Sequence, residues 1–167
     1  MTTDNVDGAR DFDFYMGRWR IQNKRLVKRL AGSTEWETFE ATAHAQPLPG
    51  GIGNYDDFIA EKWRPGFVGV SFRVFNPASK KWTIYWLDNK TGGLDANGQL
   101  TIGVVGEFKN GTGIFTCTDE FEGKPIVVRY TWSNITQNAA RWEQAFSPDG
   151  GKTWETNWVM EQTRIGD

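Results

Sequence analysis

Residues 106–133 decide the fold, and they read GEFKNGTGIFTCTDEFEGKPIVVRYTWS. Two turn signals, Asn110-Gly111 and Glu122-Gly123, divide this stretch into runs rich in β-branched and aromatic residues. Asn-Gly between such runs is a strong β-hairpin signal. The stretch therefore predicts consecutive strands that pair in antiparallel order through tight turns.

Turn-forming Gly, Pro and Asn residues separate similar runs in both directions along the chain. It predicts ten strands, over residues 18–30, 35–46, 53–61, 67–75, 81–88, 99–108, 112–121, 124–133, 138–146 and 152–164. A meander of this length exposes two long edges unless the sheet closes on itself. We therefore predict one all-β domain over residues 1–167, an antiparallel up-and-down barrel of about 8–10 strands. A short N-terminal helix over 11–16 should precede the first strand.

Composition excludes several classes of function. The 167 residues carry 19 Lys and Arg against 21 Asp and Glu, so the slight negative charge disfavours a nucleic-acid partner. A single Cys and a single His exclude a disulfide framework and multi-histidine metal sites, and we expect no metal and no cofactor. Residues 1–10 lack the apolar core of a signal peptide, and no apolar run approaches about 20 residues. We therefore expect a cytoplasmic protein with no membrane partner.

A G-x-W motif at residues 17–19 follows the predicted helix, and Arg164 lies near the end of the last predicted strand. This pairing resembles the calycins, the lipocalin-like superfamily, in which an Arg of the last barrel strand packs over the Trp of the motif. The resemblance implies that Trp19 and Arg164 form a structural latch between the two ends of the barrel. It also implies an interior ligand site, but no reaction. Further resemblance to uncharacterised lipocalin-like proteins of bacteria lies in residues 12–14, 82–86 and 141–147.

A second, local resemblance lies at residues 147–154, which read SPDGGKTW. They match the Asp-box, S-x-D-x-G-x-T-W, of sialidases, in which the box is a hairpin turn remote from catalysis. A single copy in a chain of this length does not indicate a sialidase. We expect a hairpin turn in which Asp149 accepts backbone N–H bonds and Trp154 packs behind the turn.

Nine tryptophans are more than a small core requires, and aromatic walls suit an apolar or planar ligand. Strand parity places Trp86 on one face with Ile84, and alternation allows only one of Tyr85 and Trp86 to point inward. A polar group within aromatic walls would fix the orientation of a ligand. The predicted ligand-binding residues are His44, Trp86, Asp88, Trp142, Gln144 and Trp158.

Two further features bear on the interior. Asp56 and Asp57 are adjacent in a predicted strand, so at most one of them points inward. Cys117 is expected to be a small buried thiol, because only His44 could serve it as a base.

Three functions fit this sequence. The first is a binding protein for a small, largely apolar or aromatic molecule held inside the barrel. The second is a cofactor-free enzyme of isomerase or hydrolase type that uses the same cavity, with His44 or Asp88 as acid or base. The third is a structural or interaction module with a filled barrel and no pocket. A homodimer is compatible with each of the three.

The alternation of side chains along a strand shows which residues share a face, but it does not show which face points into the barrel.

Overall fold

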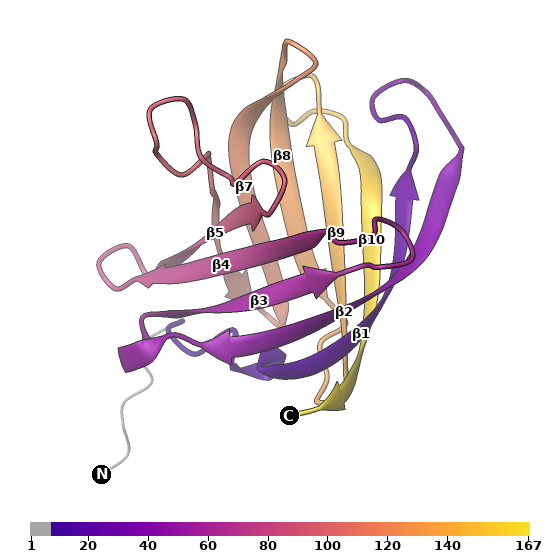
Figure 1. Ribbon diagram of the computed structural model, residues 1–167. Helices are drawn as coiled ribbons and strands as arrows, with labels where there is room; N and C mark the ends of the chain where they lie inside the picture. The colour runs from indigo at the N-terminus through magenta and orange to yellow at the C-terminus, as the bar shows by residue number, and fades with distance from the viewer. Residues whose placement is uncertain (1–7) are drawn as a thin grey trace.

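The computed structural model describes residues 8–167 and shows a closed all-β barrel of ten antiparallel strands (Figure 1). Residues 1–7, which the predicted domain includes, lie outside the described residues. The strands are β1 (Gly17–Leu26), β2 (Trp36–Pro47), β3 (Gly53–Ile59), β4 (Val68–Asn76), β5 (Lys81–Asp88), β6 (Val104–Lys109), β7 (Thr112–Phe121), β8 (Lys124–Ser133), β9 (Ala139–Ser147) and β10 (Glu155–Gly166).

Every strand pairs with the next one along the chain, and β1 pairs with β10 to close the barrel. This is the up-and-down order that the short connections predict. Closure pairs the two outer strands of the meander with each other, so neither long edge is left open. The predicted architecture is confirmed.

The main difference from the predicted strands lies before β6. The strand begins at Val104 rather than at residue 99. Within the preceding loop, Asp95 accepts backbone N–H bonds from Asn97 at 2.8 Å and from Gln99 at 2.9 Å. These bonds hold the segment in a turn, and a carboxylate that bonds its own local backbone competes with strand pairing. The loop over 89–103 is therefore longer than expected.

The predicted N-terminal helix is a single 3₁₀ turn, η1 (Asp13–Tyr15). It ends because Met16 is already extended, and Gly17 at φ 110° begins β1. A Cβ at Gly17 would lie 2.7 Å from Nη1 of Arg164, so only glycine fits there. Another 3₁₀ turn, η2 (Pro49–Gly51), joins β2 to β3.

One end of the barrel is closed by aromatic side chains around the η1 turn. Phe12 packs edge-on against Trp82, with ring centroids 5.1 Å apart. Tyr15 stacks on Trp19 at 5.2 Å, and the indole nitrogen of Trp19 donates to the carbonyl oxygen of Tyr15 at 2.7 Å. Burial of these rings supplies apolar contact area at this end, and the barrel interior begins above them.

Arg164 joins the last strand to the first strand and to the η1 turn. Its guanidinium carbon lies 4.4 Å from the centre of the Trp19 ring. The guanidinium also donates to the carbonyl oxygens of Phe14 and Met16, and Nε donates to the carbonyl oxygen of Gln137 at 2.8 Å. The structure therefore contains the latch contact that the resemblance implies, reinforced by bonds to three separate points of the backbone.

The Asp-box segment is a hairpin turn between β9 and β10, as expected. Asp149 accepts backbone N–H bonds from Lys152 at 3.0 Å and from Thr153 at 2.9 Å, and a bond from the Thr153 hydroxyl at 2.6 Å. The indole nitrogen of Trp154 donates to the Gly151 carbonyl oxygen at 3.1 Å. The hydrogen bond from the Thr153 hydroxyl, with the backbone bonds, lowers the pKa of Asp149 to about 2.

This lowered pKa predicts a pH-dependent contribution of Asp149 to stability. A carboxyl whose folded pKa lies below its ordinary value of 3.8 stabilises the fold above that pH and loses this contribution as the pH falls towards 2. Asp149→Asn should therefore be less stable than the wild type at pH 6, and the difference should shrink between pH 4 and pH 2. Urea unfolding of both proteins across this range measures it. A difference that is independent of pH would contradict the assigned role of the charge.

Candidate functional site

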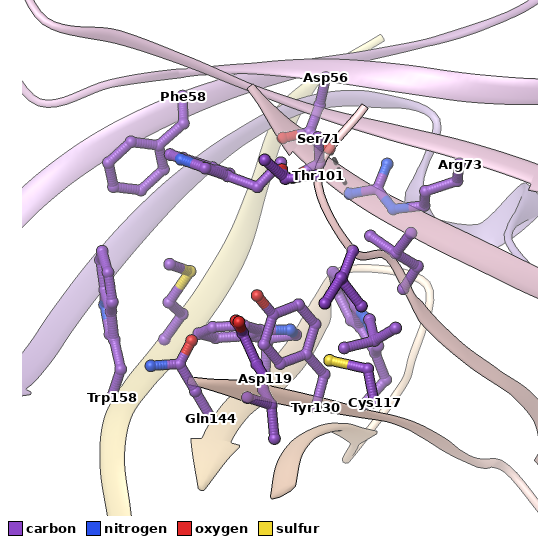
Figure 2. Close-up of a pocket in the computed structure, with 18 of the residues that line it drawn as sticks. Asp56, Phe58, Ser71, Arg73, Thr101, Cys117, Asp119, Tyr130, Gln144 and Trp158 are labelled. Carbon is purple, nitrogen blue, oxygen red and sulfur yellow. Dashed lines mark hydrogen bonds and ion pairs between the residues drawn. The ribbon is translucent and has the colours of Figure 1, made fainter. Parts of the chain in front are cut away.

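The barrel encloses a cavity of about 680 Å³ above the aromatic closed end (Figure 2). This volume lies within the range of about 300–1,000 Å³ that is typical of small-molecule sites. Aromatic side chains form much of its wall: Phe58, Trp86, Tyr130, Trp132, Trp142 and Trp158. The interior is therefore not filled, contrary to what the hypothesis of a filled structural module expects.

The three tryptophans predicted as walls, Trp86, Trp142 and Trp158, all line the cavity. Trp158 lies 6.2 Å from Trp142 and 6.3 Å from Phe58, measured between ring centroids, and each pair is close to edge-on. Edge-on contacts between aromatic rings hold the wall in a defined arrangement. Of Tyr85 and Trp86, only Trp86 faces the cavity, as alternation requires.

The Trp86 ring approaches the backbone of the neighbouring strand closely at Gly69. A Cβ at Gly69 would lie 2.2 Å from Cη2 of Trp86, so a larger residue there would force the indole to move. The missing side chain of Gly69 thus makes room for the indole beside β4.

The floor of the cavity carries a buried ion pair between Arg73 and Asp56. Arg73 is 2% exposed and Asp56 is 3% exposed, and Nη1 of Arg73 also donates to Oδ1 of Asn54 at 2.8 Å. Burial raises the pKa of Asp56, and the Arg73 charge opposes that rise. Because the two charges offset each other, the floor is polar but carries little net charge.

A second polar contact on the floor joins Tyr15 to Gln162. The Tyr15 hydroxyl donates to Oε1 of Gln162 at 2.6 Å. Burial, with the nearby Asp56 carboxylate, raises the pKa of Tyr15 well above its ordinary value, so its phenol is neutral.

The side wall carries Cys117, Tyr130 and Gln144. Burial, reinforced by the charge of Asp119, raises the pKa of Cys117 to about 11. The thiol is therefore protonated near neutral pH and is a weak nucleophile. It contributes a small, polarisable surface to the wall, but it is half-buried, not fully buried as the sequence predicts.

Two predicted polar residues, His44 and Asp88, do not line the cavity. His44 lies on the outer face of β2, because Ala43 and Ala45 point inward, and its Nδ1 lies 3.0 Å from Nε2 of Gln46. Since a general acid or base acts only within hydrogen-bond reach of its substrate, the structure places neither residue for acid–base work in the cavity. Their assignment to an interior site is therefore corrected.

Asp88 serves instead in the turn that follows β5. It accepts N–H bonds from Lys90 at 2.8 Å and Thr91 at 2.7 Å, and a bond from the Thr91 hydroxyl at 2.8 Å. Although burial acts to raise the pKa of Asp88, the hydrogen bonds from Thr91 and Lys90 lower it. Such a carboxylate caps a turn, which is a common role for Asp at the end of a strand.

Arg73, Tyr130 and Asp56 are cavity residues that the sequence analysis did not assign to the site. A signal for the ion pair was present, since Arg73 shares its parity with Ser71 and Phe75, and Asp56 shares its parity with Phe58. One charge of each sign on inward faces of adjacent strands indicates a buried pair. Recognising it requires the register between β3 and β4, in which Asp56 lies opposite Ser71.

The mouth of the cavity is bordered by the loop over 89–103, from which Leu100, Thr101 and Ile102 contribute to the lining. Leu100 and Ile102 are exposed on the surface. Outside the lining, Trp63 stacks on Phe39 with ring centroids 4.1 Å apart, and it lies 6.1 Å from the cavity residue Trp158. Aromatic packing therefore continues from the cavity wall beyond the lining residues.

Residues 8–167 include no helix that is long and apolar enough to span a membrane. Within the same residues, no three His, Cys, Asp or Glu side chains are grouped so that they could hold a metal ion.

Comparison with models of known protein families finds no match, and no curated protein is similar in sequence. Among solved structures, the chain is similar to a protein with unknown function from the DUF3598 family of Nostoc punctiforme, with a TM-score of 0.55 and 12% identity. The match covers 92% of this chain and 49% of that protein, so this chain spans about half its length. At this identity the similarity shows a shared fold alone, with a protein whose function is unknown.

Proposed function

We propose that this protein binds a small, largely apolar or aromatic molecule inside its barrel. The observation that carries this proposal is the cavity of about 680 Å³ with walls of Trp86, Trp142 and Trp158. Burying an aromatic ring between such walls is favourable by about 25 cal/mol for each Å² of apolar surface removed from water. Edge-to-face contacts with the indoles would add about 0.5–1.5 kcal/mol for each aromatic pair.

We further propose that the barrel is related to the calycins. Three features support this relationship: the closed up-and-down order of the strands, the turn before the G-x-W motif, and Arg164 over Trp19. In this arrangement one end of the barrel is closed by the latch and the other end admits the ligand. The relationship supports ligand binding and implies no reaction.

A variant that fills the cavity tests the proposal. Cys117→Phe would place a ring in the cavity from β7, whereas Thr116→Phe places the same ring on the outer surface. With a neutral naphthalene dye whose emission shifts in apolar surroundings, the wild type should bind one molecule. Cys117→Phe should bind at least about tenfold more weakly, because the added ring occupies the volume the dye needs. Fluorescence titration measures both affinities.

Thr116→Phe controls for the added apolar surface and should bind the dye as the wild type does. Circular dichroism spectra of all three proteins show whether each variant keeps the native fold. Two outcomes would contradict an interior site: no binding by the wild type, or equal affinity in the wild type and Cys117→Phe.

A further inference from the structure

Tyr130 and Gln144 are paired in register on adjacent strands β8 and β9, and both line the cavity. Figure 2 shows their side chains together on one wall, with the Tyr130 hydroxyl directed towards the cavity interior. The ring of Tyr130 packs edge-on against Trp142, with centroids 4.8 Å apart. This contact holds the Tyr130 ring in position on the strand next to Gln144.

Both side chains keep hydrogen-bonding capacity that the protein does not use. Gln144 is 8% exposed, and its Nε2 donates to Oδ1 of Asn157 at 2.9 Å. Within residues 8–167, neither Oε1 of Gln144 nor the Tyr130 hydroxyl makes a hydrogen bond to another protein group. Both atoms keep surface that faces the cavity, so an apolar ligand that displaces water from them leaves them unpaired at a cost in free energy, whereas a ligand that pairs with them avoids that cost.

The two free groups have complementary roles. The phenol of Tyr130 donates a proton, and the amide oxygen of Gln144 only accepts one. A single hydroxyl group on a ligand could accept from Tyr130 and donate to Gln144 at the same time. A ligand with no polar atom at this point would leave both protein groups unpaired, which lowers its affinity.

Charge at this wall favours a neutral group. Burial raises the pKa of Tyr130, and the nearby Cys117 and Asp119 raise it further to a smaller extent. The Tyr130 hydroxyl therefore remains a neutral donor. The nearest cation on the floor, Arg73, is already engaged by Asp56 and Asn54. An anionic group beside Tyr130 would meet the field of Asp119 and the acceptor oxygen of Gln144, and both interactions are unfavourable.

We propose that Tyr130 and Gln144 recognise a hydroxyl group, and that the ligand is a neutral aromatic compound that carries one, such as a phenol. This inference rests on the proposed function of the cavity and adds the chemical class of its ligand. The aromatic body would lie between Trp86, Trp142 and Trp158, and the hydroxyl would lie against the side wall.

Three probes that share the naphthalene ring system test the inference at pH 7: naphthalene, neutral 2-naphthol and anionic 2-naphthoate. Isothermal titration calorimetry should show that the wild type binds 2-naphthol about tenfold or more tightly than naphthalene, because two hydrogen bonds form. The 2-naphthoate ion should bind more weakly than 2-naphthol. Tyr130→Phe should lower the affinity for 2-naphthol about tenfold and leave the affinity for naphthalene within twofold.

Tyr85→Phe is the matched control, because it removes a tyrosine hydroxyl that does not line the cavity, and it should bind each probe as the wild type does. Equal affinity of the wild type for naphthalene and 2-naphthol would overturn the inference and leave the proposed function standing. If Tyr130→Phe lost affinity equally for naphthalene and 2-naphthol, the inference would also be overturned, because Tyr130 would then have a purely structural role. Preference for 2-naphthoate would also overturn it, by showing recognition of a carboxylate. Binding of no probe and no dye would contradict the proposed function as well.

Discussion

Arg73→Met should lower the free energy of unfolding by about 3–5 kcal/mol, the cost of leaving one partner of a buried ion pair without the other. The substitution preserves most of the side-chain length but removes the charge that offsets Asp56. Asn54 would also lose the donor that its amide oxygen accepts from Arg73. Urea unfolding at pH 7, followed by tryptophan fluorescence, measures the loss.

The same variant should show a defined pH dependence. Burial already raises the pKa of Asp56, and without the opposing charge of Arg73 the pKa rises further. When a carboxyl has a higher pKa in the folded protein than in the unfolded protein, the folded protein loses stability as the pH rises above the pKa of the unfolded state. The deficit of Arg73→Met relative to the wild type should therefore be larger at pH 7 than at pH 4.

A double variant separates the lost pair from general damage to the floor. Arg73→Met combined with Asp56→Leu removes both charges, and replacing a buried ion pair by apolar groups is often nearly neutral. The double variant should recover most of the stability, although Asn54 still lacks its donor. If the double variant were as unstable as Arg73→Met, the unpaired carboxylate would not be the cause.

Trp19→Ala should lower the free energy of unfolding by about 3–5 kcal/mol, as expected for a large aromatic side chain removed from a packed core. Trp19 is fully buried, stacks on Tyr15 and lies beneath Arg164. Its loss opens a cavity at the closed end and leaves the Tyr15 carbonyl without the indole donor. Thermal and urea unfolding of the variant measure the effect.

A double-mutant cycle with Arg164→Ala isolates the contact between the two residues. The coupling free energy should be about 1–2 kcal/mol, the value of a cation over a largely desolvated indole face. Arg164→Ala alone should cost more than the coupling, because it also removes bonds to the Phe14, Met16 and Gln137 carbonyls. Arg18→Ala, an exposed neighbour, should change stability by less than about 0.5 kcal/mol. Additive effects of Trp19→Ala and Arg164→Ala would show that the contact contributes no coupling.

The strands could be predicted from local sequence, because the turn residues that separate them act over only a few positions. Asn110 and Glu122 adopt positive φ at 53° and 51°, each followed by a glycine, as tight hairpins require. The loop before β6 was harder to predict from the sequence, because the carboxylate of Asp95 holds a turn within a segment whose composition also suits a strand. Competition of this kind between a side chain and the strand ladder is decided by geometry.

The candidate site was predictable only in part. Trp86, Trp142, Trp158 and Gln144 line the cavity as parity suggested, and Ala41, Ala43 and Ala45 occupy the inward face of β2. That alanine face left His44 on the outside, an outcome that parity allowed but did not decide. Asp88 has the inward parity of Trp86, yet it lies past the cavity at a turn.

The sequence by itself determined the number and order of the strands, the meander that must close, and the sets of residues that share a strand face. These properties depend on turn residues and a period of two, which operate between near neighbours. Tertiary structure alone decided that the interior is open, that Arg73 meets Asp56, and that Tyr130 lies beside Gln144. Those outcomes depend on strand register and on how side-chain volumes fill the barrel, and both are set by contacts between residues far apart in the chain.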